Sequence, residues 1–145
     1  MSHPAILETI EAFGETTHIA DPAQIVALCR YFKDEEKYIR LSGLTAVDWH
    51  PAEPRFEVVY HLHSIERNAR VRIKCRVSGA NPEIDSVYSV WRAADWHERE
   101  VYDLSGVWFT GHPDLRRILL SEDWVGHPLR KDYEFPLEYH GMRGR

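Results

Sequence analysis

The chain has 145 residues, of which 43% are hydrophobic and 28% charged, and this balance is ordinary for one globular domain. Its formal net charge of −5 argues against general nucleic-acid binding, which normally goes with a surplus of basic residues. No apolar run approaches the roughly 20 residues that cross a bilayer, and the first residues lack the basic and apolar regions of a secretory signal.

The first predicted element is an N-terminal helix. Ser2 would cap it and Gly14 would end it. Its apolar positions follow helical spacing: Ile6, Ile10 and Phe13.

A second helix has clearer start signals. Asp21 is a good N-cap, Pro22 suits the first helical position, and Gln24 completes a capping box. The apolar residues that follow fall at i, i+3, i+4 and i+7, which predicts one buried stripe: Ile25, Leu28, Cys29 and Phe32.

Three strands are predicted next. The first covers 39–47, with Gly43 as a possible bulge. The second places one set of residues on one face: Phe56, Val58, Tyr60 and Leu62. The third alternates between an apolar set and a basic set, the latter being Arg70, Arg72, Lys74 and Arg76. Such period-two alternation indicates a sheet with one buried and one open face, and the short link at 65–68 predicts a hairpin.

A third helix is predicted after Pro82. Its apolar seam is Val90, Ala94, His97, Val101 and Leu104. Asp95, Arg99 and Asp103 stand four apart and would form a charge ladder on another face. Gly106 suits the position after the helix. Residues 1–105 are therefore expected to form an α+β domain, a small antiparallel sheet with helices packed on one face.

Residues 106–145 are predicted to form a long extended C-terminal strap. Prolines and glycines break the periodicity, and only a short helical turn is expected, at 114–120. Six aromatic side chains punctuate the segment, and disordered segments normally lack these: Trp108, Phe109, Trp124, Tyr133, Phe135 and Tyr139. Aromatic and arginine residues are typical of protein interfaces, so the strap is interpreted as a segment that binds a partner protein.

The end of the third helix and the strap carry a family resemblance. The stretches are E-R-E-V-Y-D-L-S-G at 98–106, V-W-F-T-G-H-P-D-L-R-R-I-L at 107–119 and D-W-V-G-H-P-L-R-K-D-Y at 123–133. Together they resemble the signature of the thirty-kilodalton peripheral subunit of respiratory complex I, also called the C subunit of the bacterial NADH–quinone oxidoreductase. Upstream, L-T-A-V-D-W at 44–49 is similar to the first core strand of that family.

The resemblance implies a cofactor-free structural subunit. Such a chain binds no iron–sulfur cluster, flavin or nucleotide, and FMN and iron–sulfur clusters are expected in partner subunits. It packs against the forty-nine-kilodalton quinone-site subunit and other peripheral-arm subunits, binds no nucleic acid, and meets the membrane only through the complex, on the cytoplasmic side of the cell membrane. The equivalent subunit of a ferredoxin-, coenzyme F420- or hydrogenase-linked complex is the alternative.

The resemblance also points to candidate subunit-interface residues, all in the third helix and the strap. They are Glu98, Arg99, Asp103, Trp108, His112, Arg116, Arg117, Asp123, Trp124, His127, Arg130, Lys131, Asp132 and Tyr133. The arginines would be polar anchors and the aromatic residues apolar hot spots. The charged residues of the helix could instead form a solvated face.

Several histidines have two interpretations. Each of the Gly-His-Pro units at 111–113 and 126–128 turns the chain and presents a histidine, either in a hydrogen-bonded turn or for metal or proton chemistry. His61 and His63 share one strand face and are interpreted as surface residues, because two ligands do not make a metal site.

The basic set on the third strand leaves a rival function open. It fits a solvated face, a surface for an acidic partner, or an RNA-binding module. No G-x-G-x-x-G, P-loop, G-x-S-x-G or H-E-x-x-H motif occurs, which argues against a small independent enzyme. Cys29 and Cys75 form no C-x-x-C pair, so the chain alone lacks the four thiolates of an ordinary cluster, and a reducing compartment fits best.

Overall fold

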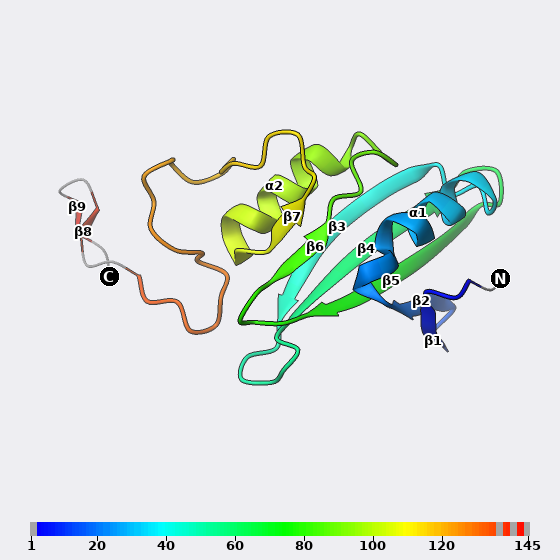
Figure 1. The fold of residues 1–145 in the computed structure, drawn as a ribbon, viewed down its shortest axis with the longest axis horizontal. Helices are drawn as coiled ribbons and strands as arrows, with labels where there is room; N and C mark the ends of the chain where they lie inside the picture. The colour runs from blue at the N-terminus through cyan, green and yellow to red at the C-terminus, as the bar shows by residue number, and fades with distance from the viewer. Residues whose placement is uncertain (1–2, 136–137, 140–141, 144–145) are drawn as a thin grey trace.

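Five strands form the main sheet in the computed structural model, which describes residues 3–135, 138–139 and 142–143. The spatial order of the strands is β1-β2-β5-β4-β3 (Figure 1). Their bounds are Ile6–Ala12 (β1), Glu15–Ala20 (β2), Arg40–Asp48 (β3), Phe56–Ser64 (β4) and Ala69–Val77 (β5). The three strands predicted between residues 39 and 77 are thus confirmed, and so is the hairpin between the second and third.

The predicted N-terminal helix is wrong, because residues 6–12 form strand β1. The strand pairs antiparallel with β2, and the turn between them places Phe13 and Gly14 at positive φ, 53° and 75°. β1 lies at the edge of the sheet and is exposed beyond Ile6, so the apolar spacing marks no buried face. Ser2, the predicted cap, lies outside the described residues.

The α+β class is confirmed, although the sheet is mixed. β3, β4 and β5 pair antiparallel as predicted, but β2 runs parallel to β5. The parallel pair arises because the chain passes through a helix, β3 and β4 before it returns to lie beside β2. The predicted bulge is also present, since the register of β3 shifts between Leu41 and Gly43.

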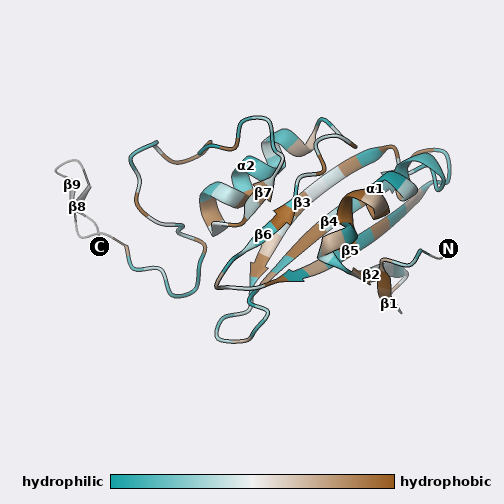
Figure 2. Cartoon of the chain, viewed as in Figure 1, coloured by the Kyte–Doolittle hydropathy of each residue, from teal (hydrophilic) through white to brown (hydrophobic). Residues whose placement is uncertain are grey.

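Both helices cover the same face of the sheet (Figure 1). A 3-10 turn at Pro22–Gln24 leads into α1 (Ile25–Asp34), and the Asp21 side chain accepts a hydrogen bond from the Ala23 amide at 3.0 Å, as expected of a cap. The predicted stripe of this helix is buried, and it packs into the same core as the apolar face of β4 and β5. Figure 2 shows bands of hydrophobic and hydrophilic residues alternating along the strands.

The chain after β5 builds a small second layer. β6 (Glu83–Asp85) precedes α2 (Ala94–Ser105), and β7 (Trp108–Thr110) returns parallel to β6. Gly106 ends α2 in the left-handed conformation, as predicted. The first residues of the predicted strap therefore belong to a strand pair that lies beside α2.

Beyond β7 the chain is mostly irregular. The predicted helical turn at 114–120 is wrong, because these residues form bends without helical hydrogen bonds. The last elements are two short strands, β8 (Glu138–Tyr139) and β9 (Met142–Arg143). Within the described residues, neither helix has the length and apolar character needed to cross a bilayer.

Candidate functional site

The irregular segment 111–135, called the tail below, runs along α2 and then toward the end of the sheet where β3 stops (Figure 1). Two buried carboxylates hold it to the rest of the chain. One is Asp103 in α2, and the other is Asp48 at the end of β3. The groups bound to them are called the Asp103 clamp and the Asp48 clamp.

The Asp103 clamp binds the middle of the tail through one side chain that is 0% exposed. One carboxylate oxygen accepts from the amides of residues 118, 119 and 120 at 3.1, 2.8 and 2.9 Å. The other pairs with Arg117 at 2.7 Å, and Arg117 also donates to the Gly126 carbonyl at 2.7 Å. Burial alone would raise the pKa of Asp103, but the three amides and the guanidinium lower it below its ordinary value.

The neighbouring charges of α2 bind the tail as well. Arg99 donates to the carbonyls of Arg116 and Arg117 at 3.1 and 2.9 Å. Asp95 pairs with His112 at 3.1 Å. The predicted charge ladder does share one helix face, but its members bind the tail and not one another. That face of α2 is consequently covered by the same chain.

Both Gly-His-Pro units are hydrogen-bonded turns. His112 Nδ1 accepts from the Asp114 amide at 3.0 Å, so its Nε2 carries the proton toward Asp95. His127 Nδ1 lies 2.9 Å from the Asp103 carbonyl, which can only accept, so the proton is on Nδ1. Burial lowers the pKa of His127. Each ring therefore fixes a bend of the tail.

The Asp48 clamp fixes the far part of the tail. Asp48 accepts from Arg55 Nε and Nη2, both at 2.8 Å, and from the Lys131 amide at 2.8 Å. Arg55 also binds Asp132, at 2.6 Å for the shorter contact. Arg55 holds the pKa of Asp48 well below its ordinary value. Arg130 extends this clamp toward α2, because it donates to the Ser105 carbonyl at 2.8 Å.

Two glycines permit this close packing. A Cβ on Gly106 would meet the Arg130 guanidinium and would lie 2.6 Å from the His127 ring. A Cβ on Gly126 would lie 2.6 Å from the ring of Tyr133, whose hydroxyl donates to the Val125 carbonyl at 3.2 Å. Both glycines also have positive φ, so a side chain there would add backbone strain to the steric overlap.

Most predicted interface residues make contacts inside the chain. Glu98 is 0% exposed and accepts from Ser86 Oγ at 2.5 Å and the Val87 amide at 2.8 Å; desolvation raises its pKa to about 7. The clamps and turns occupy eight more: Arg99, Asp103, His112, Arg117, His127, Arg130, Asp132 and Tyr133. A role of these residues in binding a partner stays a prediction.

The other predicted interface residues lie nearer the surface. Trp108 is exposed and edges against Tyr102, and Arg116 pairs with Asp114 at 2.8 Å on the surface. Lys131 joins the Asp48 clamp through its backbone amide. Asp123 is exposed and Trp124 half-buried. Their binding of a partner likewise stays a prediction.

The sequence did not single out some of the residues that the structure makes important. Asp48 and Arg55 were not recognised, because the groups that complete their clamp lie 77 and 83 positions away in the chain. Nor were three apolar side chains that the tail leaves exposed: Leu119, Val125 and Leu129. Their presence in a segment without periodicity was the available signal.

Comparisons with known proteins agree on one family. The family model described as respiratory-chain NADH dehydrogenase, 30 Kd subunit, matches residues 18–139, a range that holds both clamps. The chain is 52% identical over 129 residues to the NADH-quinone oxidoreductase C subunit of Geotalea uraniireducens, covering 89% of this chain and 79% of that relative. It is 50% identical over 137 residues to the NADH-quinone oxidoreductase C 2 subunit of Rhizobium etli, covering 90% and 71%.

Two solved structures share the fold. A trypsin-resistant fragment of Nqo5 aligns with a TM-score of 0.67 and 28% identity, covering 72% of this chain and 86% of the fragment. A chain of the membrane-bound sulfane sulfur reductase, an archaeal respiratory membrane complex, aligns with a TM-score of 0.78 and 28% identity, covering 90% and 78%. The larger of these alignments extends over nearly the whole of the present chain.

Proposed function

Because the chain belongs to the family of the 30-kDa subunit of the respiratory-chain NADH dehydrogenase, we propose that it is the C subunit of a complex I-like NADH–quinone oxidoreductase. It has no active site of its own in this proposal. It lies in the peripheral arm, on the cytoplasmic side of the membrane, and it holds the quinone-site subunit of the forty-nine-kilodalton type in register with its neighbours. FMN and iron–sulfur clusters of those subunits carry the electrons.

One observation supports this role most directly: the tail is fixed to the chain and still exposes apolar side chains. The side chains of Val125 and Phe135 are 86% and 65% exposed, although the backbone around residues 117–133 is bound by both clamps. Exposed apolar groups that gather on one segment mark interaction surfaces. A surface that is ordered before binding loses little entropy when a partner arrives, which favours stable assembly.

The structural role follows from this arrangement. Electron tunnelling between cofactors and quinone entry both depend on how the subunits are placed, so a subunit without cofactors can still control the rate. The clamps supply the rigidity, and the exposed apolar groups supply the contact with the partner. Most charged side chains of the tail bind groups of the same chain. The burial of apolar surface is therefore the main source of free energy for binding a partner.

Co-purification from membranes tests the proposal. A tagged full-length chain should bring down flavin- and iron–sulfur-containing subunits with NADH–quinone reductase activity. The double variant Val125→Asp/Leu129→Asp should reduce the recovered complex at least about tenfold, because each change buries a charge at the contact. Leu7→Asp, an apolar site of similar exposure on the edge strand β1, is the control and should leave recovery unchanged.

Two outcomes would contradict the proposal, the first as a whole and the second in the role that it gives to the tail. One is a tagged chain that brings down no other subunit from native membranes. The other is unchanged recovery of the complex with the tail variant, while its melting temperature and circular dichroism match those of the wild type. The second outcome would leave membership of a complex standing and would remove the tail from its interface.

A related complex with another electron donor is a second candidate. It is favoured by the likeness to the chain from the membrane-bound sulfane sulfur reductase, whose TM-score is the higher of the two solved structures. Ferredoxin, coenzyme F420 or hydrogen would then replace NADH. The purified complex decides between them, because an NADH-oxidising flavoprotein among its subunits supports the first proposal and its absence supports the second.

A further inference from the structure

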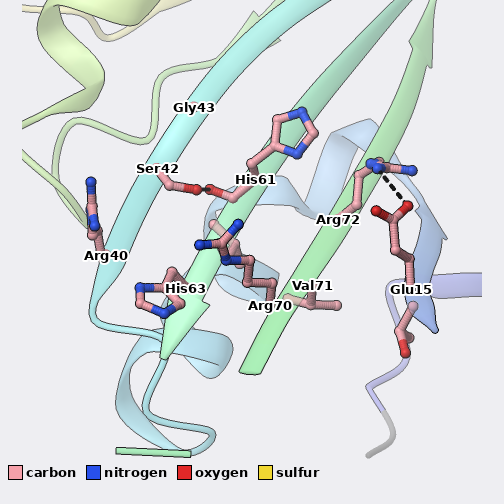
Figure 3. A pocket seen from close by; sticks show the side chains of 11 residues that line it. Glu15, Arg40, Ser42, Gly43, His61, His63, Arg70, Val71 and Arg72 are labelled. Atoms are coloured by element: carbon pink, nitrogen blue, oxygen red, sulfur yellow. Dashed lines mark hydrogen bonds and ion pairs between the residues drawn. The ribbon is translucent and has the colours of Figure 1, made fainter. Parts of the chain in front are cut away.

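The open face of the sheet, opposite the helices, carries a row of basic side chains at one end. Arg40 on β3 pairs in register with His63 on β4, and His63 pairs with Arg70 on β5. Neighbouring strands lie about 4.8 Å apart, so this cationic row spans only about 10 Å. Figure 3 shows Arg40, His63 and Arg70 along the lower end of the three strands.

A hollow lies beside the cationic row. In the next row of the sheet, Gly43 pairs with His61, and His61 pairs with Arg72. Because Gly43 has no side chain, the open face of the sheet is lower at this position. The hollow has a volume of about 400 Å³.

The charge of this hollow is not balanced by the chain. Glu15 is the single carboxylate among the lining residues, and it already pairs with Arg72 at 3.0 Å (Figure 3). Within residues 3–135 the side chains of Arg40 and Arg70 have no hydrogen bond or ion pair, and the buried Nδ1 of His63 has no partner there either. Arg40 and Arg70 lie two strands apart, and two guanidinium groups this close repel each other, although the chain as a whole has a net charge of −5. Folding therefore gives no reason for this row.

We propose that the hollow binds an acidic segment of a neighbouring subunit, with side-chain carboxylates between Arg40 and Arg70. The inference rests on the proposed function and adds a second contact, on the face of the sheet that the helices and the tail leave open. The planar guanidinium of arginine binds carboxylates with two parallel hydrogen bonds. Charge complementarity at such a site sets the orientation of the partner and speeds association.

A protein segment fits this site better than other anions. A small-molecule site normally encloses most of its ligand, whereas this hollow stands on an uncovered sheet face. A nucleic acid needs a positive surface over many phosphates, and here the basic residues are set in an acidic chain. Ile39, the chain neighbour of Arg40, is 56% exposed, and arginine beside an exposed apolar group is typical of protein interfaces.

Photocrosslinking in the assembled complex tests this inference. A benzophenone amino acid replaces Ser42, an exposed residue that lines the hollow, in the tagged full-length chain. A second chain carries the same group in place of Val125 in the tail. After irradiation of membranes, mass spectrometry should identify a peptide of another subunit, rich in Asp or Glu, attached at position 42.

Charge reversal then tests the arginines. Arg40→Glu/Arg70→Glu should lower the yield of this crosslink at least about tenfold, because like charges would face one another. Changing the contacted acidic residues to lysine should restore it. The matched control is Arg30→Glu/Arg92→Glu, which makes the same change of charge at exposed positions outside the hollow and should leave the yield unchanged.

The outcomes separate the two proposals. In one outcome the chain co-purifies with other subunits and the Val125 probe crosslinks, while the Ser42 probe captures no molecule, or captures a lipid, an RNA or a peptide without carboxylates. In that case the inference about the hollow is wrong and the proposed function stands. If the wild-type chain brings down no other subunit at all, both are wrong.

Discussion

On the helix side of the molecule, buried or half-buried charges such as Asp48, Asp103 and Arg117 each bind several groups of the same chain. On the open side of the sheet, Arg40 and Arg70 bind none among residues 3–135. The contrast separates two uses of charge: the first set determines where the tail lies, and the second is available to other molecules. The free energy of unfolding of four variants tests this contrast.

Asp103→Ala should have the largest effect, a loss of about 3–5 kcal/mol in the free energy of unfolding, because it leaves a guanidinium and three amides without their buried partner. Urea denaturation measures it. The pKa of Asp103 is lowered in the folded chain, so its contribution is present above pH 3.8, the ordinary value, and is lost as the pH falls further. The control is Asp114→Ala at the surface pair with Arg116, which should change stability little. Equal effects at both sites would contradict the role of the Asp103 clamp.

Arg55→Lys should lower the free energy of unfolding by about 1.5–3 kcal/mol, because an ammonium group cannot bind Asp48 through two nitrogens and still reach Asp132. The same substitution at Arg67, whose pair with Glu36 lies on the surface, should have a smaller effect. Thermal and urea denaturation compare the two variants. If Arg67→Lys proved the more damaging, the Asp48 clamp would not be a stabilising contact.

Glu98→Gln tests a buried carboxyl by its pH dependence. Burial raises the pKa of Glu98 to about 7, from 4.5, so its contribution to stability is complete below pH 4.5 and is lost as the pH rises through 7. Glutamine does not titrate, so the stability of the variant relative to wild type should improve by about 1–3 kcal/mol between pH 5 and pH 8. Urea denaturation at a series of pH values measures the difference. A constant difference would mean that Glu98 keeps an ordinary pKa.

Arg40→Glu/Arg70→Glu should have the smallest effect, a change within about 0.5 kcal/mol, because neither side chain has a partner among the described residues. Arg30→Glu/Arg92→Glu serves as the control for the change in net charge. Urea denaturation of the isolated chain should find the two variants alike. A large loss in the free energy of unfolding confined to the first variant would show that the cationic row stabilises the fold. The two sides of the molecule would then not differ in their use of charge.

The sequence predicted the parts of the fold in which one face of an element is buried. Alternation in β4 and β5, and the stripe of α1, each report contact with the core. β1 was mistaken for a helix because it is an edge strand that is exposed beyond Ile6, so Ile10 in the strand and Phe13 in the turn after it mark no buried face. The parallel pairing of β2 with β5 likewise cannot be predicted from a pattern within either strand.

The site was predictable in position and not in its contacts. The resemblance pointed to α2 and the tail, where both structural clamps find most of their partners. Periodicity could not reveal that Asp103 binds residues 14 to 17 positions away, or that Asp48 binds the amide of Lys131. These contacts depend on where the helix C-terminus and the sheet edge meet in space, which local patterns do not encode.

The reach of the Asp48 clamp has a consequence for synthesis. Asp48 and Arg55 leave the ribosome close together, but Lys131 follows Asp48 by 83 residues. At roughly 5–20 residues per second this interval is on the order of ten seconds. For the later part of that time, after β5 has been made, the newborn polypeptide has the strands of its main sheet but lacks the contacts of the Asp48 clamp with the tail, so the apolar core beside α2 is incompletely covered. Nascent chains arrested shortly before position 117 should accordingly be more open to proteases than released ones.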